Sequence, residues 1–150
     1  MATRHQARTA VVGLLYAYDL GNDNIAAFSD EILESDKIRN RQREFSNALF
    51  KGTIDNLATI DEEIQKHLKD WDYHSIGKVE KSIMRLAGYE ILIEGTDKRI
   101  IINEAIELAK ALADDQSPRF INAVLDALGK EEIATIEKPE ERELPQEKPA

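Results

Sequence analysis

The stretch SIMRLAGYEILI, residues 82–93, decides the fold of this chain. A helix drawn through it is apolar on nearly every side, through Ile83, Met84, Leu86, Ala87, Tyr89, Ile91, Leu92 and Ile93. A helix that is hydrophobic all round is typical of the centre of a globular bundle. Gly95 follows at the place where a left-handed residue commonly ends a helix. We therefore expect a central, buried helix with other helices packed around it.

Helical patterns also fill the chain on both sides of this stretch. Apolar residues at intervals of three and four predict helices over about 3–20, 26–34, 40–52, 57–71, 102–112 and 117–128. The fourth of these is expected to bend near Thr59. The pattern also predicts that Ala48 and Leu112 face inward. Gly21 and Gly129 stand where glycine ends a helix, and Ser117 precedes Pro118 as an N-cap precedes a first-turn proline. No alternating strand pattern appears. The predicted fold class is all-α, with about seven helices.

Length and composition bound the class of protein. A chain of 150 residues can bury a real core as one domain. It contains no cysteine, which excludes a disulfide framework and the usual zinc modules. No apolar run approaches the ~18 residues that a membrane span needs, and the start lacks a secretory signal. We expect a cytoplasmic protein with no membrane contact.

The first helix carries an unusual charge distribution. The chain has a formal net charge of -9, yet nothing before Asp19 is acidic, and Arg4, His5 and Arg8 lie there. A helical wheel places these cations and Tyr16 outward, away from an apolar face. Cations bind phosphates, and a flat ring stacks on an unpaired base. The helix therefore indicates an RNA contact; the alternative is that its basic residues are purely structural.

The last twenty residues differ in composition from the rest. Residues 131–150 hold seven glutamates against three basic residues, and three of the chain's four prolines. Such a segment buries too little apolar surface to offset chain entropy. We expect a helical domain over 1–130 and an acidic, Pro/Glu-rich disordered tail over 131–150. The tail is either a solubilising extension or an RNA mimic that competes for the basic helix.

Signatures of catalysis and of metal binding are missing from the sequence. His5, His67 and His74 are far apart, without metal-binding spacing, and the seven glycines form no phosphate-binding loop. We therefore expect no enzyme activity, no cofactor and no metal.

Four blocks together resemble the NusB family of bacterial transcription antitermination factors, over residues from about 4 to 130. They are RHQARTAVVGLLYAYD at 4–19, Trp71, VEKSIMRLAGYEIL at 79–92 and INEAIELAKALADDQSPRFINAVLDAL at 102–128. The resemblance implies two packed helical bundles and no enzyme activity. It also implies binding to the boxA element of ribosomal RNA leader transcripts, together with the ribosomal protein NusE, in the RNA polymerase antitermination complex.

The resemblance also assigns residues. It implies RNA contacts by Arg4, His5, Arg8, Tyr16, Gln116, Ser117, Arg119 and Phe120, and places Glu80 near the surface shared by RNA and NusE. Two positions depart from the family pattern: His5 stands where an arginine is common, and Gln116 where an acid is common. An amide can donate and accept a hydrogen bond, whereas an ionised acid only accepts, so base preference or affinity is expected to differ.

Other function classes stay open at this point. One is the RNA-binding domain of a ribosomal RNA cytosine methyltransferase, which resembles this family but would need a catalytic domain after residue 130. Another is a helical adaptor that binds only proteins. The family contains monomers and dimers, so a homodimer through the basic helix is also open; it would hide the RNA-binding face.

Overall fold

The computed structural model describes residues 2–68 and 73–129, and these two ranges are helical with no strand, as predicted. The elements are α1 (Arg4–Asp19), η1 (Asp23–Phe28), α2 (Ser29–Ser35), α3 (Asn40–Asp55), α4 (Leu57–Gln65), η2 (Tyr73–Ser75), α5 (Lys78–Gly88), η3 (Tyr89–Ile93), α6 (Lys98–Leu112) and α7 (Ser117–Ala127). Trp71 and the expected disordered tail lie outside the described residues.

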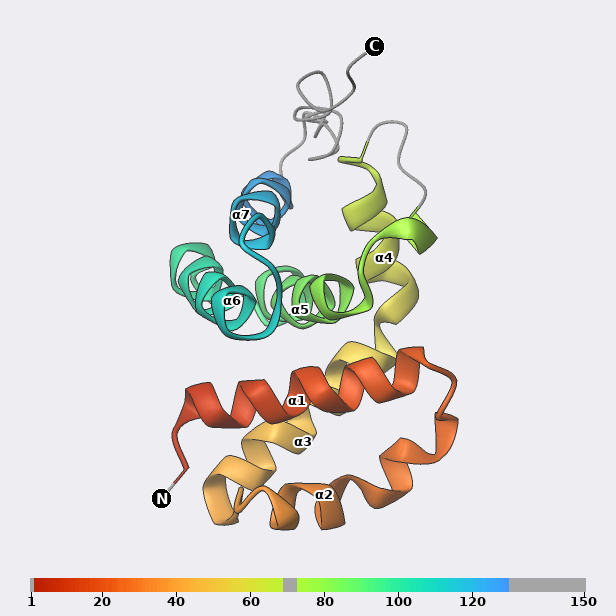
Figure 1. Cartoon of the computed structure of the whole chain (residues 1–150), viewed down its shortest axis with the longest axis vertical. Helices are drawn as coiled ribbons and strands as arrows, with labels where there is room; N and C mark the ends of the chain where they lie inside the picture. Colours follow the sequence, from red (N-terminus) through yellow and green to blue (C-terminus); the bar gives the residue numbers. More distant parts are fainter. Residues whose placement is uncertain (1, 69–72, 130–150) are drawn as a thin grey trace.

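The helices form two packed bundles (Figure 1). Helices α1, α2 and α3 make the lower bundle, and α4 to α7 make the upper one. Helix α1 packs against both α3 and α5, so it lies at the junction of the two bundles. An apolar face of this helix was predicted to pack inward, and its side chains Val11 and Leu14 are buried.

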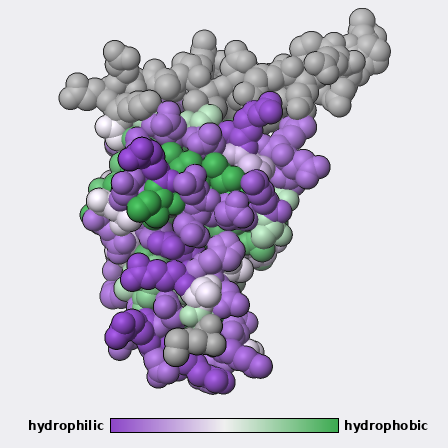
Figure 2. Space-filling model, turned by 90° about the vertical axis from the view of Figure 1, so that its left-hand side faces the viewer, coloured by the Kyte–Doolittle hydropathy of each residue, from purple (hydrophilic) through white to green (hydrophobic). Residues whose placement is uncertain are grey.

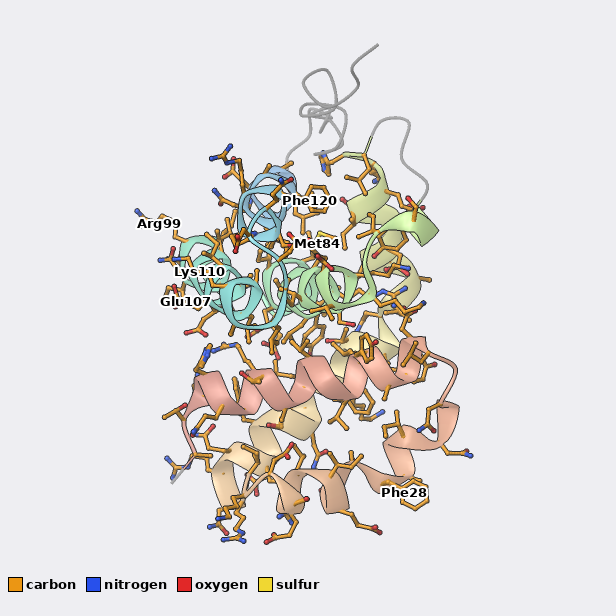
Figure 3. The ribbon with its side chains drawn as sticks, viewed as in Figure 1. Phe28, Met84, Arg99, Glu107, Lys110 and Phe120 are labelled. Atoms are coloured by element: carbon orange, nitrogen blue, oxygen red, sulfur yellow. The ribbon has the colours of Figure 1, made fainter. Side chains whose placement is uncertain are left out.

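The predicted central helix is confirmed. Ile83 and Met84 are fully buried, and Met84 lies in the middle of the upper bundle (Figure 3). The helix continues from α5 into η3, a five-residue π-helix. Such wider turns are rare and often mark functional positions. Here the π-helix carries a buried acid, Glu90, into the junction with α1.

The ends of α1 follow the sequence closely. Thr3 and Gln6 form a capping box: Thr3 Oγ1 accepts from the Gln6 N–H at 3.0 Å, and Gln6 Oε1 accepts from the Thr3 N–H at 2.8 Å. Gly21 has a φ of 102°, which glycine adopts without steric cost, so it ends the helix as predicted. These caps fix where the basic start of α1 begins; this segment, residues 4–8 with Arg4, His5 and Arg8, is called the head below.

Several local predictions were wrong. A bend was predicted near Thr59, but α4 runs through Thr59 without one. The chain breaks between α3 and α4 at Asn56, whose Nδ2 donates to the Gly52 carbonyl at 2.8 Å. Ala48 is exposed, and Leu112 is 39% exposed, so neither faces the core. Periodicity alone cannot show which edge of an inner face a neighbouring helix covers.

Candidate nucleic-acid interface

Ion pairs fasten helix α1 to the upper bundle near both of its ends. Near its start, Arg8 Nε and Nη2 donate to Glu90 Oε2 and Oε1 at 3.0 and 2.8 Å. At its end, Asp19 accepts from Lys78 Nζ at 3.0 Å and from Arg85 Nη1 at 3.1 Å. Helix α1 is therefore held near both ends, and it runs antiparallel to α5 and η3.

Arg8 is the clearest correction to the sequence analysis. Its side chain was expected to face outward, but it is only 6% exposed and forms a bidentate pair with Glu90. Burial opposes its charge, yet hydrogen bonds and Coulomb attraction from Glu90, with weaker attraction from Glu104 and Glu94, leave its pKa raised. The guanidinium is held inside the junction, so its role here is to position α1.

Arg4, unlike Arg8, is exposed to solvent. Its guanidinium carbon lies 4.6 Å from the centroid of the Phe45 ring, and that of Arg8 lies 5.2 Å from the same centroid. Phe45 comes from α3 and is half-buried. Stacking on an aromatic face leaves the donors of a guanidinium edge open to a phosphate. Arg4 is thus oriented and available.

His5 faces an acid across the junction. Its Nδ1 lies 3.3 Å from Glu104 Oε2, and the two side chains are 44% and 31% exposed. The ring is accessible to a ligand, but a carboxylate from α6 lies beside it. Any phosphate that approaches His5 also approaches Glu104.

Tyr16 lies on the outer face of α1, as predicted, and it is 37% exposed. It follows Arg4 by twelve residues, which places it ~18 Å further along the helix axis at 1.5 Å per residue. Because α1 is fixed at both ends, this separation between cation and ring is also fixed. The helix therefore holds an exposed cation and an exposed ring at two fixed positions.

The turn before α7 divides its predicted residues into two groups. Gln116 and Arg119 are exposed, whereas Ser117 is 5% and Phe120 is 4% exposed. The Phe120 ring points into the upper bundle between α7 and α4 (Figure 3), so it offers no stacking face. The structure gives Ser117 and Phe120 a framework role in place of the direct contact we expected.

A carboxylate, Asp114, organises this turn. Its Oδ1 accepts from the N–H groups of Gln116 and Ser117 at 3.0 and 3.1 Å. Ser117 was predicted as the N-cap of α7, but it is the first residue of this helix, and Gln116 holds the N-cap position. Ser117 Oγ donates to Glu80 Oε2 at 2.6 Å. Glu80 is half-buried and joins the start of α5 to the turn. Its role in partner binding stays a prediction.

Two residues that shape the head, Phe45 and Glu90, were not among the predicted site residues. Arg85 of α5 donates to Asp61 at 2.9 and 2.8 Å and to Asp19, so Glu90 has Arg8 as its cationic partner. The signal for Glu90 was present: an acid in an apolar stretch needs a buried cation, and Arg8 supplies it.

The described residues, 2–68 and 73–129, hold no group of three or more histidine or acidic side chains that could bind a metal. Within those ranges, no helix is long and apolar enough to cross a membrane. Figure 2 shows one side of the molecule, where hydrophobic patches lie in the upper half and hydrophilic side chains dominate the lower half. That lower half corresponds to the α1–α3 bundle, which carries the head of α1.

Comparisons with known proteins agree with this architecture. The model of the NusB family matches residues 5–130. The transcription antitermination protein NusB of Sulfurovum sp. (strain NBC37-1) is 74% identical over 130 residues, covering 87% of this chain and 100% of that protein. The T. maritima NusB structure matches with a TM-score of 0.79 at 29% identity, over 95% of this chain and 98% of that one. A solved complex of the antitermination factors NusB and NusE with double-stranded RNA matches with a TM-score of 0.75 at 27% identity, over 83% and 93%.

Proposed function

The chain belongs to the NusB family, and from this premise we propose that it is a transcription antitermination factor. It binds the boxA element of ribosomal RNA leader transcripts together with NusE, and it joins the RNA polymerase antitermination complex in the cytoplasm without catalysing a reaction. The observation that carries the proposal is the acid-free head of α1, held rigidly in an otherwise acidic protein. The NusB and NusE complex with double-stranded RNA supports the choice of ligands.

The RNA strand follows the outer side of α1. Arg4 contacts a phosphate, His5 a second polar group of the backbone, and Tyr16 stacks on an unpaired base. Gln116 and Arg119 reach the strand from the turn before α7. Arg8, Ser117 and Phe120 act indirectly, because they hold these two elements in place. In the head, the exposed residues Arg4 and His5 therefore contact RNA, and the buried Arg8 positions the helix that carries them.

NusE completes the site. The exposed cations of the proposed track are few, and neutralising few phosphates releases few counterions, so the protein binds RNA weakly by itself. A basic partner beside α5, near Glu80, extends the cationic track and raises affinity by joint contact. By linkage, RNA tightens NusE binding by the same factor that NusE tightens RNA binding.

Calorimetric titration tests this proposal. The protein is titrated with a boxA-containing leader RNA and with a shuffled RNA of equal length, each with and without NusE. We expect preference for the boxA RNA and a larger affinity in the presence of NusE. Equal affinity for both RNAs would remove boxA recognition. Binding to NusE without any RNA binding would favour a helical adaptor that contacts only proteins.

A further inference from the structure

The densest basic run of this acidic chain lies outside the residues that have been assigned a function. It is KIRNRQR, residues 37–43, with four cations in seven residues and no acid among them. The run connects α2 to α3 and includes the first turn of α3. Acids flank it, and one of them, Glu34, forms ion pairs with Arg39 and Arg43. The two remaining cations are Lys37 and Arg41.

Lys37 occupies a backbone position that normally selects glycine. It has a φ of 61°, just past the end of α2. The Ile38 N–H donates to the Leu33 carbonyl at 2.8 Å, and the Lys37 N–H donates to the Glu34 carbonyl at 2.9 Å, which together form a Schellman motif. A residue with a Cβ is strained in this conformation. Lysine at this position therefore weakens the fold relative to glycine.

Arg41 also stands against the local preference. It lies in the first turn of α3, where the helix macrodipole is positive and disfavours a cation. Lys37 and Arg41 are both exposed, and among the described residues neither forms an ion pair. The macrodipole of α2 favours a cation at Lys37, just past the end of that helix, but no pairing with an acid among the described residues accounts for either charge.

The run lies beside the head of α1. Residues 36–42, which include the acid Asp36, line an open groove together with Ala2 and with Gln6 and Thr9 of α1. Helix α3 also carries Phe45, the ring under Arg4. Figure 1 shows the starts of α1 and α3 at the same end of the lower bundle, and Figure 2 shows hydrophilic side chains covering that end.

We infer that Lys37 and Arg41 form a second phosphate-binding site that extends the RNA track from the head of α1 across the groove to the start of α3. The inference rests on the proposed function and adds a site to it. The head supplies only one permanently charged, exposed side chain, Arg4, because Arg8 is buried and position 5 is a histidine. The run at 37–43 supplies the cations that the head lacks.

Lys37→Gly and Arg41→Gln, singly and together, test the inference. RNA binding is measured by fluorescence anisotropy at several salt concentrations, using the boxA-containing leader RNA on the full chain. Thermal unfolding is measured in parallel. Arg99→Gln is the matched control, since Arg99 is an exposed arginine of the upper bundle, far from the start of α3 in Figure 3.

The expected result separates binding from folding. Lys37→Gly relieves the left-handed strain, so its thermal midpoint should stay equal or rise while RNA binding weakens severalfold. The double variant should flatten the dependence of log affinity on log salt by ~1.4, which is ~0.7 for each lost contact to a single strand. Arg99→Gln should leave this slope at the wild-type value.

Failure of the inference differs from failure of the proposed function. If Arg4→Ala weakens RNA binding but the double variant binds with wild-type affinity and salt slope, the second site is refuted and the proposed function stands. If the wild-type protein shows no preference for the boxA RNA, the proposed function fails first. Equal loss in Arg99→Gln and Arg41→Gln, which each remove one positive charge, would reduce the effect to net charge and would also overturn the second site.

Discussion

Arg8 of α1 and Glu90 of η3 are joined by two hydrogen bonds, of 3.0 and 2.8 Å, within the junction of the two bundles. The residues are 82 positions apart, and both are almost completely buried. The pair therefore couples the position of the basic head to the π-helix of the upper bundle. Its energetic consequence is asymmetric, because one partner cannot be removed without leaving a buried charge.

Arg8→Met should destabilise the protein by roughly 3–5 kcal/mol, since it leaves Glu90 buried and unpaired. The double variant Arg8→Met/Glu90→Leu should recover most of this loss, because both charges are gone. Urea unfolding at pH 7 measures the free energy of unfolding of the three proteins. A double variant no more stable than Arg8→Met would show that the pair does not act as a unit.

Asp19 makes stability depend on pH at the other end of α1. Burial tends to raise the pKa of this carboxyl, but hydrogen bonds from Lys78 and Arg85 outweigh it and leave the pKa lowered. A lowered pKa in the folded state stabilises above the unfolded value of about 3.9, and the contribution is lost as pH falls through the folded value. Unfolding free energy should therefore decline below about pH 4.

Asp19→Asn is the variant that isolates this effect. It should be less stable than wild type at neutral pH, and the difference should shrink as the pH is lowered through the acid range. Circular dichroism during urea unfolding at several pH values measures it. A difference that stays constant from neutral to acidic pH would assign the acid sensitivity to other carboxyls.

The central helix and the exposed ring could be predicted from sequence because each depends on one helix. Burial of Ile83 and Met84 follows from apolarity on all sides, and exposure of Tyr16 follows from its place on the wheel. Burial of Arg8 could not be predicted in this way. A helical wheel gives the direction of each side chain around its own helix, but it does not show which neighbouring element lies there. The burial of Arg8 depends on the position of Glu90 in η3.

The turn before α7 shows the same limit. The sequence predicted a helix that begins at Ser117–Pro118 with Ser117 as its cap, but Ser117 is the first residue of the helix, and its N–H donates to Asp114 Oδ1. It also did not reveal Glu80 as the acceptor for Ser117, because that contact joins residues 37 positions apart. Contacts between distant elements decide which residues of a matched motif remain exposed.

Arg4→Ala should weaken RNA binding and flatten the log affinity–log salt dependence by about 0.7, the value for one contact to a single strand. Helicity and thermal midpoint should hardly change, because Arg4 is exposed and Thr3 and Gln6 still cap α1. Anisotropy titrations at several salt concentrations measure the slope. Weaker binding with an unchanged slope would mean that Arg4 contacts something other than phosphate.

Tyr16→Ala should weaken RNA binding by ~1–3 kcal/mol, the usual contribution of a stacked base, whereas Tyr16→Phe should keep most of the affinity. The ring is 37% exposed and otherwise packs against the fold, so thermal unfolding of both variants is measured in parallel to separate a loss of stability from a loss of stacking. The comparison uses the same boxA-containing RNA for both variants. Wild-type affinity in Tyr16→Ala would leave this ring as surface packing only.

Glu104→Gln should strengthen RNA binding. The Glu104 carboxylate lies 3.3 Å from His5 Nδ1, so it competes with phosphate for that ring and repels the RNA backbone. The amide keeps the shape of the side chain and removes the charge. Because screening weakens exposed charge interactions, the gain should be largest at low salt and should fade as the Debye length drops toward ~8–10 Å.

Glu107→Gln is the control for net charge. Glu107 lies on the same helix, is 62% exposed, and pairs with Lys110 at 3.5 Å on the outer side of α6 (Figure 3). Both substitutions remove one negative charge, but only the first removes it beside the head of α1. A larger gain for Glu104→Gln would identify Glu104 as a local brake on RNA binding, whereas equal gains would contradict that role and leave a general effect of the net charge.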